Sequence, residues 1–257
     1  MNSRKVKEVE LEMLQLSMQL RKDLTLPASD ALNTEKVLQS KHILAVLKPL
    51  EDTFSGMAVM ASDAKGNPIR CMLVNTAQSL GKQRFTICHE LYHLLYQCGF
   101  SYSVNNAGTF NEADLEEYKA DVFASFLLLP KESMESMLPT QVLLQKRRIS
   151  LADILAVEQN YQCSRIVVLR RLKSMGIISG LEFDVFSRNV TRSAMEFGYN
   201  TQLYKPTGKI EVIGDYNLKA RKLYSEGRIS MSRYMELIRE MGIYNNEEEN
   251  DTEGDIA

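Results

Sequence analysis

The most informative segment of the sequence is Thr86-Ile87-Cys88-His89-Glu90-Leu91-Tyr92-His93-Leu94-Leu95. It holds two of the three histidines of the chain, four residues apart, with a glutamate directly after the first. On a helix, residues at positions i and i+4 project from the same face, so His89 and His93 can bind one metal ion together. Glu90 then lies where it can accept a proton from an attacking water molecule. The spacing therefore predicts a helix that carries two zinc ligands and a general base.

The composition is that of an ordinary globular protein of 257 residues, with 44% hydrophobic and 25% charged residues. A formal net charge of −2 predicts no general attraction to nucleic acid or to membranes. The four cysteines lack CxxC spacing, the chain starts without an apolar signal core, and no apolar run approaches the ~18 residues that span a bilayer. We therefore expect a cytoplasmic protein with reduced thiols and no membrane contact.

Two helices are expected before the metal-binding stretch. Residues 5–21 distribute apolar side chains among charges with helical periodicity. Residues 34–47 predict a second helix that stops before Pro49. His42 falls inside this second helix, and we interpret it as an ordinary helical residue rather than a metal ligand.

A β-hairpin and a further helix are expected on either side of the metal-binding stretch. Residues 56–62 and 68–75 are short apolar runs around a turn-rich segment, which is typical of a hairpin. Residues 111–128 predict a helix with Asn111 as N-cap, ended by Pro130. The pattern indicates an α+β fold, rich in helices, with a small antiparallel sheet beside the two site helices.

A catalytic zinc site needs a third protein ligand, and a carboxylate is expected because His42 lies in a separate helix. The 111–128 helix offers five acids: Glu112, Asp114, Glu116, Glu117 and Asp121. Glu117 and Asp121 are four residues apart, so with Glu117 as ligand, Asp121 can accept the outer N–H of a zinc-binding histidine. Glu116 has only Ala120 at the matching position. The alternative is that the first acids form a solvated helical turn favoured by the helix dipole.

These motifs together resemble the thermolysin-type zinc peptidases, the gluzincins. Residues 83–91 and 117–130 are more specifically similar to the ImmA/IrrE family of metallo-endopeptidases, a resemblance that covers 56–130 well and continues weakly to about residue 179. It implies a zincin-like peptidase core that holds zinc, or manganese, through three side chains. By this resemblance the metal ligands are His89, His93 and Glu117, the general base is Glu90, and Asp121 orients a ligand.

The resemblance also implies an activity: a zinc-dependent endopeptidase that hydrolyses a peptide bond with activated water. Its implied substrate is a helix-turn-helix transcriptional repressor, in a mobile element or a stress response. Tyr92 departs from the family, which usually has glycine there. A donor for the oxyanion is sought among Tyr92, Tyr96 and Tyr102, and the substrate is expected to pair with an edge strand. The sequence does not choose the tyrosine or the strand.

A basic segment follows the implied peptidase core. Residues 151–156 and 163–172 resemble a helix-turn-helix, with Gln162 in place of the usual turn glycine. The segment carries five more positive than negative charges, from Lys146, Arg147, Arg148, Arg165, Arg170, Arg171 and Lys173 against Asp153 and Glu158. It could contact DNA phosphates, pack as a helical subdomain with a solvated basic face, or recognise an acidic protein. The alternative function is thus a non-catalytic DNA-binding or partner-binding regulator on a zinc-peptidase scaffold.

Four regions are expected along the chain. Residues 1–140 form the metallopeptidase core with its N-terminal helices, and 141–180 form the helix-turn-helix-like region. Residues 181–245 form a mixed C-terminal region. The tail at 246–257 is acidic and is expected to be disordered.

Overall fold

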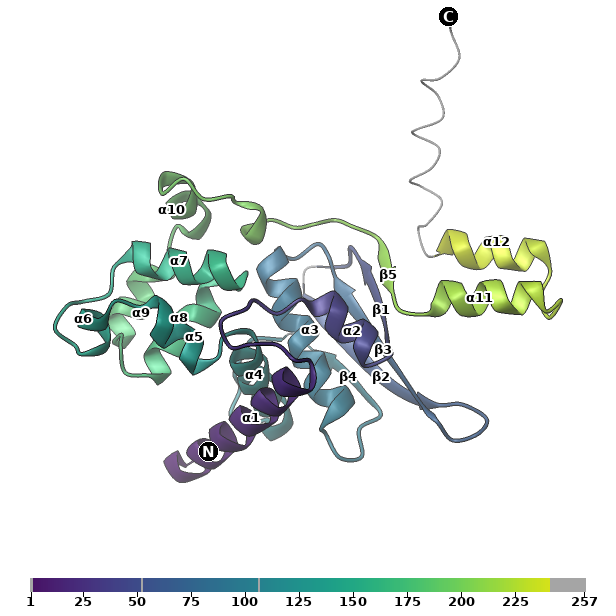
Figure 1. Cartoon of the computed structure of the whole chain (residues 1–257), viewed down its shortest axis with the longest axis horizontal. Helices are drawn as coiled ribbons and strands as arrows, with labels where there is room; N and C mark the ends of the chain where they lie inside the picture. The colour runs from purple at the N-terminus through teal and green to yellow at the C-terminus, as the bar shows by residue number, and fades with distance from the viewer. Residues whose placement is uncertain (1, 52, 106, 241–257) are drawn as a thin grey trace, which may run out of the picture.

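Five strands form one mixed sheet in the computed structural model of the protein, in the order β4-β2-β3-β1-β5 (Figure 1). Their bounds are β1 (Ile43–Lys48), β2 (Gly56–Ser62), β3 (Pro68–Asn75), β4 (Tyr102–Asn105) and β5 (Glu211–Ile213). The structure describes residues 2–51, 53–105 and 107–240, so the predicted acidic tail at 246–257 lies outside the described residues. The chain combines this small sheet with a larger number of helical residues, which confirms the predicted α+β class.

The predicted β-hairpin is confirmed, since β2 and β3 pair antiparallel with Gly56 opposite Val74. The sheet as a whole differs from the prediction because it is not entirely antiparallel. β1 pairs with β3 in parallel, and β3 therefore lies between two strands of opposite direction.

The prediction of a helix over 34–47 is wrong beyond residue 40. Helix α2 (Thr34–Ser40) ends there, and the chain continues as β1. Ile43, Ala45 and Leu47 are buried while the residues between them are less so, which is the two-residue period of a strand. His42 stands at the junction with a φ of 52° and is exposed. A short apolar run does not distinguish a strand from a helix by periodicity, and here the sheet determines the outcome.

Three helices build the layer that carries the predicted site: α1 (Ser3–Asp23), α3 (Leu80–Leu95) and α4 (Leu115–Leu128). Helix α3 packs against β2 and β3, α4 packs on α3, and α1 packs on α4. Helix α4 begins at Leu115 rather than near 111, because its N-cap is Asp114, whose side chain accepts the N–H of Glu117. Asn111, the predicted N-cap, accepts the N–H of Ala113 in the preceding turn instead.

The helical region after the site comprises α5 (Lys131–Met137), α6 (Thr140–Leu143), α7 (Leu151–Tyr161), α8 (Arg165–Ser174), α9 (Gly180–Phe186) and α10 (Val190–Glu196). Ser150 starts α7 with a capping box to Asp153. Gln162 takes the left-handed conformation between α7 and α8, with a φ of 52°, at the place where a glycine is usual. Buried residues of α7 and α8 belong to the same apolar cluster as those of α3 and α4.

A strap at residues 202–213 runs from the helical region to the sheet through η1 (Gln202–Tyr204) and β5. The N–H of Leu80 donates to the carbonyl of Lys205 at 2.9 Å, so the strap holds the first residue of α3. β5 then pairs antiparallel with β1, with Ile213 opposite Ala45. The strap covers the β1 edge of the sheet, and β4 forms the opposite edge.

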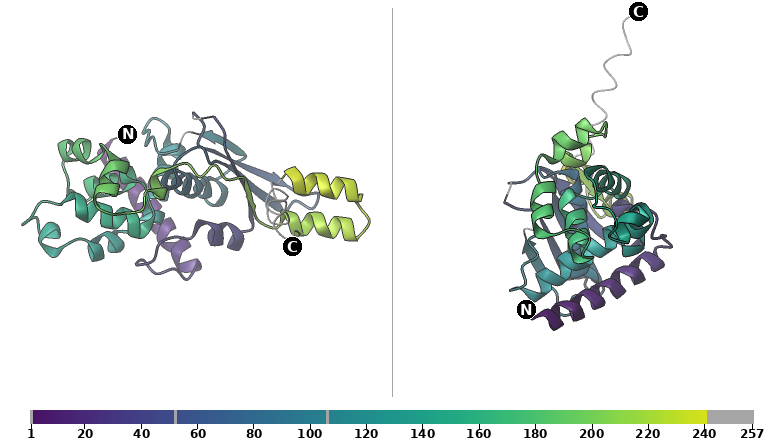
Figure 2. Two further views of the ribbon diagram at one scale, coloured as in Figure 1. Left: turned by 90° about the horizontal axis from the view of Figure 1, so that it is seen from above. Right: turned by 90° about the vertical axis from the view of Figure 1, so that its left-hand side faces the viewer.

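Two helices, α11 (Tyr216–Ser225) and α12 (Met231–Glu240), pair as a hairpin beyond β5. They lie at the opposite end of the molecule from α7–α10, as the two views agree (Figures 1 and 2). Within the part of the chain that the structure describes, no helix is both long enough and apolar enough to cross a bilayer.

Gly56 allows the sheet to approach α3 closely, and its replacement is expected to destabilise the fold. A Cβ at this position would overlap Cγ2 of Thr86 and lie 3.1 Å from the carbonyl oxygen of Leu73. Gly56→Ala should therefore lower the free energy of unfolding by about 1–3 kcal/mol in urea titrations. Adding Thr86→Ser removes the overlapping methyl group and should restore most of the loss. An unchanged midpoint in Gly56→Ala, or no rescue by Thr86→Ser, would contradict this packing.

Candidate metal centre

The two histidines predicted to bind a metal lie on one face of α3 and point to the same place. Their Nε2 atoms are 3.2 Å apart, and their ring centroids are 4.9 Å apart. Both side chains are about 1% exposed. The i, i+4 spacing on a helix thus places two imidazole nitrogens around one point, as the sequence predicts.

Glu117 of α4 reaches the same point from the facing helix. Its Oε2 lies 3.1 Å from Nε2 of His89, and its Oε1 lies 3.4 Å from Nε2 of His93. One ligand atom from each of the three residues lies within 4.8 Å of the others. Glu117 is 22% exposed, so the cluster opens to solvent on its side. The carboxylate chosen from the sequence is the one that the fold brings to the histidines.

The electrostatics of the cluster fit a metal cation. Burial lowers the pKa of His89, but hydrogen bonds to Asp121 and Glu117 outweigh burial and raise it to about 10. Burial and the neighbouring His89 lower the pKa of His93. The site therefore favours added positive charge but disfavours two charged imidazoles. Two imidazole nitrogens and one carboxylate oxygen are a donor set of catalytic zinc sites, so a divalent ion fits these residues.

Asp121 holds His89 from behind and also shapes the neighbouring loop. Its Oδ1 lies 2.8 Å from Nδ1 of His89, in the orienting position predicted from the sequence. The same carboxylate accepts the N–H of Gly108 at 2.8 Å and the N–H of Phe110 at 2.6 Å. One buried side chain thus fixes both the imidazole and the loop that precedes α4.

His93 has its own orienting partner, which the sequence analysis missed. Oε1 of Gln97 lies 2.5 Å from Nδ1 of His93. The ring of Phe100 also stacks on His93, with 5.3 Å between the ring centroids. Gln97 could have been predicted from its i+4 position relative to His93. The same spacing relative to Glu117 identifies Asp121.

Glu90 is fully buried, and only one of its carboxylate oxygens has a hydrogen-bond partner. Ser103 on β4 donates its hydroxyl to Oε2 at 2.8 Å, while Oε1 has no partner in the described part of the chain. Burial raises the pKa of Glu90 to about 7, against the opposing effects of His89 and Ser103. The sequence gives no local signal for Ser103, because it reaches Glu90 through the pairing of β4 with β2.

The three candidate tyrosines have different surroundings. Tyr92 is buried against Phe123 and donates its hydroxyl to Glu116 at 2.8 Å. This bulky residue therefore packs α3 against α4 and points its hydroxyl at a carboxylate. Tyr96 also packs on Phe123. Tyr102 is 70% exposed on the edge strand β4, which leaves it as the solvent-exposed side chain of the three.

An apolar pocket of about 300 Å³ lies along the same helix as the histidines. Phe85 lines it one helical turn before His89, and Lys82 lines it almost one turn earlier. Its other walls come from the 107–110 loop, held by Asp121, and from Ile166 and Val167 at the start of α8. The pocket thus lies between the first half of α3, the 107–110 loop and the start of α8.

Several basic residues of the 146–173 segment are buried or already make contacts within the protein. Arg165 and Arg171 are 1% and 6% exposed. Arg147 pairs with Asp153 at 2.9 Å, and the guanidinium of Arg170 lies 4.0 Å from the centroid of the Phe110 ring. These contacts support the packing interpretation of the segment over a basic DNA-binding face.

Comparison with known protein families gives a match to a family model. Residues 49–173 match the family model Peptidase_M78, described as the IrrE N-terminal-like domain. The matched region contains β2, β3, β4, the two helices of the candidate metal site and all five predicted site residues. No curated protein matches the chain.

Proposed function

Through residues 49–173 the chain belongs to the ImmA/IrrE family of metallopeptidases, and from this premise we propose that it is a zinc-dependent endopeptidase. One observation carries the proposal. His89, His93 and Glu117 converge beside Glu90, a buried carboxylate with one oxygen that has no hydrogen-bond partner among the described residues. This set combines three metal ligands with a base, which is what hydrolysis by a metallopeptidase requires.

His89, His93 and Glu117 would hold the zinc ion, which supplies Lewis acidity that lowers the pKa of water towards about 7 and polarises a peptide carbonyl. Glu90 moves the proton: Oε1 accepts it from the attacking water and returns it to the leaving amine. Ser103 holds the other oxygen and so fixes the direction of the carboxylate. Asp121 and Gln97 fix the two imidazole rings.

The substrate would bind as an extended segment along β4. The opposite edge of the sheet is covered by β5, and β4 carries Ser103, which contacts the proposed base. Backbone hydrogen bonds to an edge strand select for extended, unfolded segments rather than for a particular sequence. The apolar pocket beside Phe85 would then accept one apolar side chain of the substrate.

We further propose a helix-turn-helix repressor as the substrate, and this part rests on the family resemblance. The alternative function is a non-catalytic DNA-binding or partner-binding regulator on a zinc-peptidase scaffold. The burial of Arg165 and Arg171 argues against DNA binding by the alternative regulator, because neither side chain lies on the surface where duplex DNA would bind. Zinc rather than manganese is proposed because the donor set contains two imidazoles.

The test is direct proteolysis by the purified, zinc-loaded protein. A mixed peptide library and a helix-turn-helix repressor encoded beside the gene are incubated with it, and products are identified by mass spectrometry. We expect cleavage before or after apolar residues, loss of cleavage after chelation, and recovery on adding zinc. Cleavage that survives complete removal of metal would contradict the proposal.

Asp121→Ala is expected to weaken zinc binding by about 10- to 100-fold, because His89 and the 107–110 loop lose their shared partner. Competition with a chromophoric chelator measures this change. The matched control is Asp153→Ala, the same change at a capping carboxylate of α7, which contacts Ser150 and Arg147 rather than the proposed ligands. It should lower the stability of the protein and leave zinc affinity unchanged. Equal zinc affinity in wild type and Asp121→Ala would contradict the orienting role.

A further inference from the structure

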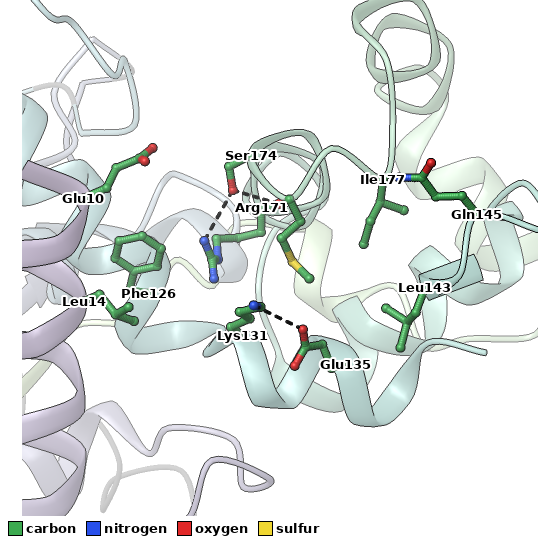
Figure 3. A pocket seen from close by; sticks show the side chains of 11 residues that line it. Glu10, Leu14, Phe126, Lys131, Glu135, Leu143, Gln145, Arg171, Ser174 and Ile177 are labelled. Carbon is green, nitrogen blue, oxygen red and sulfur yellow. Dashed lines mark hydrogen bonds and ion pairs between the residues drawn. The ribbon is translucent and has the colours of Figure 1, made fainter. Parts of the chain in front are cut away.

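A second pocket, of about 370 Å³, lies away from the candidate metal centre, between the core and the helical region (Figure 3). Leu14 of α1, Phe126 of α4, Lys131 of α5, Leu143 of α6 and Arg171 of α8 line it. None of the proposed metal ligands contributes to its walls. Its volume lies within the range of small-molecule binding sites.

Arg171 is the unusual residue of this pocket, because it is buried without a counter-charge. Its guanidinium carbon lies 4.2 Å from the centroid of the Phe126 ring. Nε donates to the carbonyl of Leu129 at 3.2 Å, and Nη1 donates to the hydroxyl of Ser174 at only 3.4 Å. Among the described residues no carboxylate lies within 4.0 Å of it. Figure 3 shows the guanidinium directed into the space between Phe126 and Lys131.

Two other buried arginines have hydrogen-bond partners for both terminal nitrogens, although Nε of Arg21 has none among the described residues. Arg165, the first residue of α8, forms an ion pair with the buried Glu158. Arg21 lacks a carboxylate partner, but its two terminal nitrogens donate to three carbonyl oxygens. Arg171 has neither arrangement. A buried charge is costly unless it is paired, so a missing partner at a solvent-accessible pocket points to a ligand.

The other charges of the pocket do not supply that partner. Lys131 is paired with Glu135 at 3.4 Å, which leaves both groups neutralised by each other. Burial lowers the pKa of Arg171 to about 10, so it still carries its charge at neutral pH. The charges of Glu10 and Glu132 raise the pKa of Arg171, but neither carboxylate is within ion-pair distance of it. The remainder of the wall is largely apolar, including Leu14, Leu143 and Ile177.

We propose that this pocket binds a small organic anion, with a carboxylate or phosphate head at Arg171 and an apolar body against Leu14, Leu143 and Ile177. The planar guanidinium suits either head, because it offers two parallel donors to two oxygens. The proposal is independent of the peptidase activity, since it uses none of the residues of the metal centre.

Calorimetric titration of the full-length, zinc-loaded protein tests the proposal with four probes: octanoate, octyl phosphate, octanamide and inorganic phosphate. We expect saturable binding of at least one of the two octyl anions, and the tighter of them identifies the head group. Octanamide and inorganic phosphate should bind at least about tenfold more weakly, because each lacks one half of the ligand. No saturable binding of either octyl anion at millimolar concentration, or equal binding of octanamide, would overturn the proposal.

Variants locate the site. Leu143→Trp fills the pocket while keeping Arg171, and Leu144→Trp is its control, because the neighbouring Leu144 is 58% exposed and does not line the pocket. Leu143→Trp should weaken octyl-anion binding at least about tenfold, and Leu144→Trp should leave it unchanged. Arg171→Met should remove the preference for anions over octanamide. If Arg171→Met does not fold, Leu143→Trp alone decides. Unchanged affinity in Leu143→Trp would overturn the assignment.

Discussion

Glu90→Gln is expected to retain the metal and to lose peptide hydrolysis by about 10²- to 10⁴-fold, the contribution of general base catalysis. The amide has the size of the carboxylate and can still accept the hydroxyl of Ser103, so the fold and the ligands should be unaffected. It cannot take a proton from water, because an amide oxygen is a very weak base. Initial rates of cleavage on a peptide substrate, together with zinc content by mass spectrometry, measure both halves of this expectation.

The matched control is Glu116→Gln, the same chemical change beside the site. Glu116 accepts the hydroxyl of Tyr92 and pairs with Lys119 at 3.3 Å, but it is not among the metal ligands. It should keep both zinc and activity. If Glu90→Gln cleaves as fast as wild type, the base has been assigned to the wrong residue. If Glu90→Gln matches wild type in every cellular phenotype, proteolysis is not the biological function of the protein.

Arg165→Met is expected to lower the free energy of unfolding by about 3–5 kcal/mol, because it leaves the buried Glu158 without its counter-charge. Arg165 also donates to the carbonyl of Phe186 at 3.0 Å and to the hydroxyl of Ser193 at 3.2 Å, so α8 loses its ties to α9 and α10. Urea unfolding followed by circular dichroism measures the loss. The double variant Glu158→Gln with Arg165→Met removes both charges and should recover much of it.

The Arg165→Met loss should also depend on pH. Burial raises the pKa of Glu158 above its usual 4.5, and Arg165 opposes that effect. Without Arg165 the folded pKa rises further, while the unfolded value stays the same. A carboxyl with a raised folded pKa destabilises the protein above the unfolded value, and the effect disappears below it. The destabilisation should therefore be largest near pH 7 and shrink below about pH 4.5. An equal loss at both pH values would show that packing, not charge, dominates.

The sequence predicts which side chains converge, because their spacing is local to two helices. His89 and His93 are fixed by the helical repeat, and so are Glu117 and Asp121. The choice of Glu117 over Glu116 needed only the requirement that one acid bind and a second orient. Packing brings α3 and α4 together. The sequence nevertheless predicts that they meet, because a catalytic zinc site needs a third protein ligand in addition to the two histidines.

The parts that the sequence did not predict depend on distant contacts. Ser103 reaches Glu90 only because β4 pairs with β2, and nothing around residue 103 signals that pairing. The sequence prediction assigns β1 to the end of a helix, because its apolar run of five residues, 43–47, fits either structure until β3 lies beside it. The short β5 is similarly defined by its partner β1, because Val212 and Ile213 favour a strand but three residues are too few to predict one.

Zinc content after dialysis tests the central claim most directly, and it needs no knowledge of the substrate. The wild-type protein should hold about one zinc ion per chain, while His93→Ala and Glu117→Ala should each lose it, since a three-ligand site does not survive the loss of one ligand. Glu116→Ala is the control at the neighbouring position and should retain the metal. Undiminished zinc in His93→Ala or in Glu117→Ala would contradict the ligand assignment on which the proposed peptidase rests.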